Sequence, residues 1–252
     1  MKRFLFLFTI CIAFSSCQEN VKFNTPGFQA QKDDVFWRAN DARAYVSATG
    51  KLTIEAFTSY EKVTLNANSK NNGTYIVGTT NANNSATYHS NFNDTIIDYA
   101  TLAVPGPVNS VALINGGTGY ASDCTQQPPN NEYVCTLDHD TTGGTGSGLK
   151  VALVANGSGV VTSIIKVTAR GNGYVPGDIV TVALGGVNCK VRVLNTQNSN
   201  GEIQITNYDN VNFTVTGKFK FSAVNINSNP LTGPLLNFQY GEFYKVPIYP
   251  SM

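Results

Sequence analysis

The chain has 252 residues and a formal net charge of +1, and only 13% of its residues are charged. Nucleic-acid binding depends on clustered Lys and Arg side chains that neutralise phosphates. The sequence has no basic run interleaved with aromatic residues, so we exclude that class. The length suits one large all-β domain or two smaller ones. Abundant Asn, Thr, Ser and Gly are typical of exported β-proteins.

The N-terminus carries an export signal. Lys2 and Arg3 precede an apolar run from Phe4 to Phe14, which is too short to span a bilayer as a helix, and two serines then lead to Cys17. The segment resembles a bacterial lipoprotein signal, in the looser form of Bacteroidota that tolerates an aromatic residue before the cysteine. The alternative is an ordinary secretory signal that is cleaved elsewhere.

The lipoprotein resemblance implies where the mature chain resides. The signal peptide would be residues 1–16, and Cys17 would become the acylated first residue that anchors the protein to the outer membrane by fatty acids such as palmitate. Residues 17–25 then form a polar tether. Glu19 places one acidic residue near the anchor, which is similar to surface-export signals of some Bacteroidota, but the sequence leaves the surface and periplasmic faces both open.

After the tether, the strand period recurs. Leu52, Ile54 and Ala56 alternate with polar residues. A second run, which includes Gly217 at an apolar position, places one set of residues on one face: Phe213, Val215, Phe219, Phe221 and Ala223. Gly217 predicts a bulge or the close approach of another backbone. The alternation predicts an all-β fold, an antiparallel sandwich or barrel.

The middle of the chain contains an internal repeat. A V-x-S-[VI] strand followed by G-x-G-Y occurs twice, ending at Tyr120 and at Tyr174, and we expect each tyrosine to cap a hairpin. Asn156-Gly157-Ser158-Gly159 predicts a hairpin turn before the second copy. The unit resembles glycine-rich β-repeats of phage tail-associated proteins and secreted bacterial surface proteins.

The flanking segments carry a second resemblance. Thr25-Pro26-Gly27-Phe28, Phe36-Trp37-Arg38 and Gly241-Glu242-Phe243-Tyr244 are similar to segments of uncharacterised Bacteroidota lipoproteins, in which both flanks form one compact β-domain. The resemblance implies a split β-domain of residues 26–106 and 200–252, with residues 107–199 as an inserted β-repeat domain. Polar, turn-rich junctions tolerate such insertions.

Three cysteines remain beyond the anchor. Cys124 and Cys135 flank a polar loop and could close it as a disulfide in the oxidising envelope. Cys189 shares strand parity with three valines, which predicts a buried, inert thiol. The cysteines lack close CxxC spacing and the chain has 2 histidines, so we expect no metal site made of these residues.

No motif carries catalysis. Asp138 and Asp140 begin a stretch similar to a calcium loop, but Leu149 stands where the EF-hand needs an acid, so a polar turn competes with a weak calcium site. No serine has a G-x-S-x-G setting, and the acidic residues and His89 fit solvated strand faces or turns. We therefore expect neither an enzyme nor a cofactor.

Aromatic side chains suggest binding. Exposed rings on a β-surface can stack on sugars or anchor a protein. Parity predicts that Phe238 and Tyr240 are buried, whereas Tyr244 and Tyr249 are expected to be exposed. The sequence predicts an envelope lipoprotein with a binding or accessory role towards a glycan or a protein. The alternatives are a glycan-acting hydrolase and a structural subunit of an outer-membrane assembly.

Overall fold

The structure is a computed structural model that describes residues 27–120, 124–127, 132–183, 186–227 and 232–250, without the side chains of residues 127, 132 and 135–137. The expected signal peptide (1–16), Cys17 and the tether (17–25) lie outside these residues. The described residues form strands and their connections and contain no helix, which confirms the all-β prediction.

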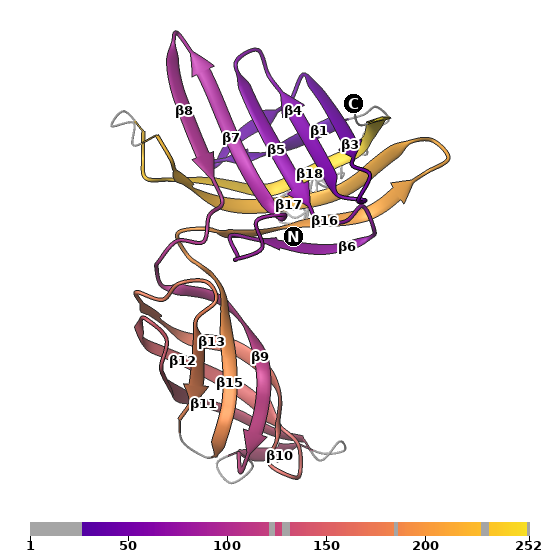
Figure 1. The fold of residues 1–252 in the computed structure, drawn as a ribbon. Coiled ribbons are helices and arrows are strands. Elements are labelled where there is room, and N and C mark those ends of the chain that lie inside the picture. Colours follow the sequence, from indigo (N-terminus) through magenta and orange to yellow (C-terminus); the bar gives the residue numbers. More distant parts are fainter. Residues whose placement is uncertain (1–26, 121–123, 128–131, 184–185, 228–231, 251–252) are drawn as a thin grey trace, which may run out of the picture.

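Eleven strands form the first sheet, in the order β2-β1-β18-β3-β4-β5-β7-β8-β17-β16-β6. Their bounds are β1 Gly27–Lys32, β2 Val35–Arg38, β3 Asp41–Val46, β4 Leu52–Phe57, β5 Glu61–Ala67, β6 Gly73–Val77, β7 Ser85–Phe92, β8 Thr95–Ala100, β16 Asn200–Asp209, β17 Thr214–Asn225 and β18 Leu235–Pro250. Neighbouring strands are antiparallel except for β18 and β3. Because β18 also pairs with β17, the sheet folds over into two layers, β3-β4-β5-β7-β8 and β1-β18-β17-β16 (Figure 1).

The core lies between these layers. The predicted alternation of β4 is confirmed, with Leu52, Ile54 and Ala56 buried. On β17 the prediction holds from Val215 to Ala223 but is wrong for Phe213, which is 63% exposed. Phe213 precedes β17 in the turn after β16 and has a positive φ of 50°, so strand parity does not apply to it.

Gly217 is a point of close approach, as predicted. A Cβ atom there would lie 2.0 Å from the carbonyl oxygen of Gln204 and 2.4 Å from the ring of Phe243. The register of β17 also shifts between Val215 and Gly217, so the glycine sits at a bulge. Only glycine leaves room for both the neighbouring strand and the core ring.

Seven strands between β8 and β16 form the second sheet, in the order β13-β12-β11-β14-β15-β9, with β10 paired to β11. Their bounds are β9 Val108–Thr118, β10 Thr125–Gln127, β11 Glu132–Thr142, β12 Ser147–Ala155, β13 Val161–Asn172, β14 Ile179–Val182 and β15 Val187–Thr196. The predicted turn at Asn156–Gly159 joins β12 to β13, where the Gly159 N–H donates to the Asn156 carbonyl (2.8 Å). That the two sheets fold as separate units stays a prediction.

The two repeat copies occupy equivalent places in the second sheet. The first G-x-G-Y strand, β9, pairs with β15, and the second, β13, pairs with β12. Tyr120 and Tyr174 are buried in the core, and each ring packs on a glycine, because a Cβ at Gly186 or Gly146 would lie 2.5 Å from the ring. The tyrosines are therefore central packing residues, and the glycines make room for them.

Buried polar side chains join the two sheets. Asn195 Nδ2 donates to the Val77 carbonyl (3.0 Å), and Thr196 Oγ1 donates to the Val104 carbonyl (3.0 Å). Ser199 Oγ accepts from the Leu102 N–H (2.9 Å). All three side chains are buried and hydrogen-bonded, so the Asn195 bond ties β15 to β6 of the first sheet, and the other two tie the connections on either side of the second sheet to each other.

Candidate functional site

A hollow lies on the outer face of β16, β17 and β18, the orange and yellow strands of Figure 1. Its volume is about 360 Å³, which falls within the range of about 300–1,000 Å³ that is usual for small-molecule sites. We call it the Tyr240 groove. Its lining residues are Glu202, Gln204, Lys218, Phe219, Lys220, Gln239, Tyr240, Gly241 and Glu242.

Tyr240 is the exposed aromatic residue of this groove. Its side chain is 79% exposed and its φ is 51°, in the left-handed region that non-glycine residues rarely adopt. The prediction that Tyr240 is buried is therefore wrong, whereas that for Phe238 is confirmed at 0% exposure. The reason is a β-bulge: Phe221 pairs with Phe238 and Phe219 with Gly241, so β18 has one residue more than β17 between these pairs.

Gly241 forms the floor of the groove. It pairs with Phe219, and a Cβ atom at this position would lie 2.6 Å from the Phe219 ring. The glycine is buried, and it lets the core ring close over the backbone directly beneath the outer face. The bulge and this contact together fix the backbone from which the Tyr240 ring projects.

Charged and amide side chains surround the ring. Lys220 pairs with Glu202 (3.2 Å) and Lys218 faces Glu242 (3.9 Å), and all four are substantially exposed. Gln204 and Gln239 add neutral donors and acceptors. The groove thus carries two positive and two negative charges beside an exposed aromatic ring, and it offers hydrogen bonds without a strong net charge.

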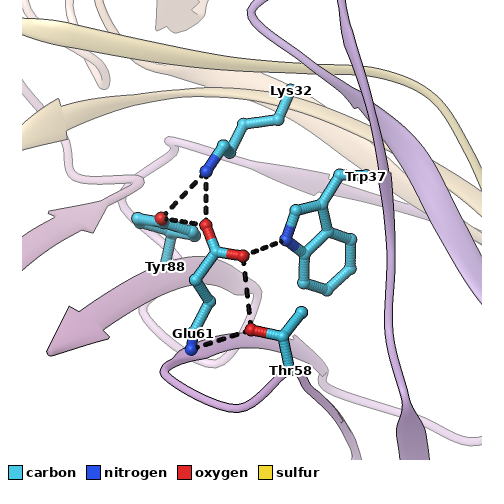
Figure 2. A network of polar contacts seen from close by, with 5 residues as sticks. All are labelled: Lys32, Trp37, Thr58, Glu61 and Tyr88. Atoms are coloured by element: carbon cyan, nitrogen blue, oxygen red, sulfur yellow. Dashed lines mark hydrogen bonds and ion pairs between the residues drawn. The ribbon is translucent and has the colours of Figure 1, made fainter. Parts of the chain in front are cut away.

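A second polar cluster joins residues of β1, β2, β5 and β7 and of the turn before β5 (Figure 2). The Glu61 carboxylate at the start of β5 accepts hydrogen bonds from Lys32 Nζ, Tyr88 OH (2.6 Å) and Trp37 Nε1 (2.7 Å). Thr58 Oγ1 lies 3.3 Å from the same carboxylate and accepts the Glu61 N–H (3.0 Å). Lys32 Nζ also donates to Tyr88 OH (3.0 Å). Sequence reasoning missed this cluster.

Burial and hydrogen bonds shift the pKa values of the three titratable groups in this cluster. Burial alone would raise the pKa of Glu61, but the bonds from Lys32, Tyr88 and Trp37 outweigh it and lower that pKa. Burial would lower the pKa of Lys32, yet the bonds to Glu61 and Tyr88 raise it. Burial and the bond to Glu61 raise the pKa of Tyr88. These shifts keep Glu61 and Lys32 charged and Tyr88 neutral at neutral pH, which are the protonation states that the hydrogen bonds of the cluster require.

His89 lies on the outer face of β7, as expected for a strand-surface residue. Its Nδ1 lies 2.6 Å from Asp98 Oδ1, and Asn227 Nδ2 donates to Asp98 Oδ2 (2.8 Å). Burial would raise the pKa of Asp98, but the bonds with Asn227 and His89 lower it. A hydrolytic triad also needs a nucleophile at the other imidazole nitrogen. Within the described ranges, His89 Nε2 has no hydrogen-bond partner.

The two predicted binding tyrosines lie outside the Tyr240 groove. Tyr249 is 46% exposed and its ring lies 6.2 Å from that of Tyr45. Tyr244 is half-buried, so the prediction that it is exposed is wrong, and Lys245 Nζ lies 5.3 Å from the centre of its ring. A binding role for either residue stays a prediction.

Of the two cysteines in the predicted disulfide, only Cys124 has a described side chain. Cys124 is disulfide-bonded. The side chain of Cys135 lies outside the described residues, but Thr125 pairs with Val134, so the hairpin register places Cys135 opposite Cys124. Cys189 is a free, buried thiol, as predicted, and burial raises its pKa to about 11. Such a thiol is inert as a nucleophile.

The calcium candidates lie on β11. Asp138 and Asp140 are exposed on either side of buried His139, and Asp140 pairs with Lys150 (3.2 Å). Among the described residues, no group of three or more His, Cys, Asp or Glu side chains is arranged to hold a metal ion.

In the part of the chain that the structure covers, no helix has the length and apolar character to cross a membrane. No curated protein and no solved structure matches the chain. A family model described as a domain of unknown function matches residues 24–116 and 164–247, which is well over half of the chain and includes β16, β17 and most of β18. The chain therefore belongs to this family, DUF6252.

Proposed function

We propose that this protein is a lipid-anchored envelope lipoprotein with a non-catalytic binding role, and that the Tyr240 groove holds its ligand. The observation that carries the proposal is the exposed ring at a positive φ. A left-handed conformation costs a tyrosine about 1–2 kcal/mol, and such strain clusters at functional sites. A purely structural position would favour glycine, and a solvent-facing ring contributes little to the core.

The titratable groups of the Glu61 cluster support a role without catalysis. Glu61, Lys32 and Tyr88 are satisfied by hydrogen bonds to one another, and the lowered pKa of Glu61 and the raised pKa values of Lys32 and Tyr88 keep the three groups in their ordinary charge states. In the groove, Glu202 and Glu242 are each tied to a lysine. A glycosidase instead needs two carboxyl groups that face each other across the scissile bond.

The proposed localisation rests on the N-terminal sequence. The apolar run and the serines before Cys17 support acylation of that residue, and the anchor would hold the domain at the outer membrane. One acyl chain gives only marginal membrane binding, whereas the several chains typical of lipoprotein anchors hold a domain stably.

Two measurements test the proposed function. Cells that express the full chain and are fed an alkyne fatty acid should label the protein, and Cys17→Ser should remove the label and release it from the membrane fraction. A soluble form of residues 17–252 with Cys17→Ser should bind isolated cell envelopes, and Tyr240→Ala should abolish this binding. An unlabelled protein would refute the anchor. Envelope binding that is unchanged in Tyr240→Ala would refute the role of the groove.

A further inference from the structure

We infer that the Tyr240 groove binds an uncharged glycan, an inference that rests on the proposed binding function and names its ligand class. A sugar ring has an apolar face of C–H groups and a polar rim of hydroxyls. The groove offers the matching arrangement, because an aromatic ring lies exposed among amide, carboxylate and ammonium groups. The C–H face packs on Tyr240, and the hydroxyls hydrogen-bond to the surrounding side chains.

The charge of the groove selects against charged polymers. Lys218 and Lys220 are balanced by Glu242 and Glu202, and each lysine is paired across the strands. A polyanion would be attracted to the lysines and repelled by the carboxylates at the same short distance. Hydroxyl groups both donate and accept, so they can use both kinds of charged side chain as well as Gln204 and Gln239.

Strand pairing on both sides of β18 fixes the backbone around Tyr240 in the absence of a ligand. Around the bulge, β18 pairs on one side with β17, through Phe219 and Gly241, and on the other with β1, through Gln31 and Gln239. Both neighbouring ladders shift register at this bulge, so the position of Tyr240 is set by two strands. A site on a paired strand loses less conformational entropy on binding than a site on a free loop.

The face is less suited to a protein partner. Protein hot spots concentrate on well-packed cores that are depleted of charge, surrounded by a polar rim. Here one exposed ring stands among four charged residues, and the next residue, Gly241, presents only backbone. A protein ligand is therefore the rival outcome of the test.

The test uses the soluble Cys17→Ser protein in affinity electrophoresis through gels that contain β-glucan, mannan or xylan, with polygalacturonate as the charged comparison. At least one neutral polysaccharide should retard the protein. Tyr240→Ala should weaken this retardation at least about tenfold, and Tyr240→Phe should keep it. Tyr60→Ala should leave it unchanged, because Tyr60 is an exposed tyrosine between β4 and β5 that lies outside the groove. Gln204→Ala should weaken it as a second, independent variant. Retardation by polygalacturonate alone, or by none of the gels, overturns the inference.

A parallel assay separates this inference from the proposed function. Isolated envelopes are oxidised with periodate, which cleaves the vicinal diols of sugars, or are digested with protease. Tyr240-dependent binding should be lost after periodate and survive protease. Binding that survives periodate and is lost after protease means a protein ligand, which overturns the glycan inference and leaves the binding function standing. Untreated envelopes that fail to bind the protein refute the binding function itself.

Discussion

Lys32 at the end of β1 and Glu61 at the start of β5 form an ion pair across 29 residues of chain, and this contact ties the β1–β2 hairpin to the opposite layer of the first sheet (Figure 2). The side chains are only 26% and 13% exposed. Trp37, which also donates to Glu61, packs edge-on against Phe28 and Phe238. The polar cluster is thereby continuous with the aromatic core.

Replacement of Glu61 should destabilise the protein strongly. Glu61→Gln leaves the Lys32 ammonium group without its carboxylate, so we expect the free energy of unfolding to fall by about 2–4 kcal/mol. Chemical denaturation followed by tryptophan fluorescence measures this loss. Glu55→Gln is the matched control: Glu55 pairs with Lys62 at 3.6 Å on a more exposed face, and its replacement should cost only about 0.5 kcal/mol. Equal losses would contradict the structural role of the cluster.

The same cluster should make stability depend on pH in acid. The folded-state pKa of Glu61 lies below its ordinary value of 4.5, so its contribution is fully present above that value and is lost as the pH falls through the folded pKa. The difference in unfolding free energy between the wild type and Glu61→Gln should be constant near pH 7 and shrink below about pH 4.5. A difference that grows on acidification would show that the shift has the opposite sign.

Gly217 should tolerate no side chain. Gly217→Ala places a methyl group against the Gln204 carbonyl and the Phe243 ring, so we expect a loss of at least about 2 kcal/mol in unfolding free energy. Gly233→Ala is the control, because the nearest atom to its Cβ would be 3.7 Å away and its φ is not in the left-handed region. Thermal melts of the two variants side by side measure the contrast. Similar melting temperatures would mean that the bulge has room to spare.

The alternation of residues predicted much of this fold, because strand parity is a local property. It located β4 and most of β17, and the repeat and the hairpin turn were visible in the spacing of glycines. The burial that parity predicts is wrong for Phe213 and Tyr240, because a turn and a bulge each introduce a positive φ there. The Lys32–Glu61–Tyr88 cluster has no local signal, because its members come from strands that meet only after long-range pairing.

Thiol counting tests the cysteine assignments. The soluble Cys17→Ser form of residues 17–252 has three cysteines, and we expect no thiol to react with a disulfide reagent in the native state, because Cys189 is buried and its pKa is raised to about 11. Denaturation without reductant should expose one thiol, and prior reduction should expose three. Three reactive thiols in the unreduced, denatured protein would rule out the Cys124–Cys135 disulfide.

Removal of the strained ring should improve stability. Tyr240→Gly relieves the left-handed conformation, so we expect an increase of up to about 1 kcal/mol in unfolding free energy. Gln239→Gly, at the neighbouring position without a positive φ, should instead lower stability. Urea denaturation of both variants measures whether each change in unfolding free energy is positive or negative. A loss of stability in Tyr240→Gly would mean that the ring supports the fold, which would remove the strain argument for a functional site.

If Tyr240 serves binding at the expense of stability, its replacement by glycine should separate the two properties. The dissociation constant for isolated envelopes should be determined for the soluble wild-type protein and for Tyr240→Gly. We expect the variant to be at least as stable as the wild type and to bind at least about tenfold more weakly. A stable variant that binds as tightly as the wild type would contradict it.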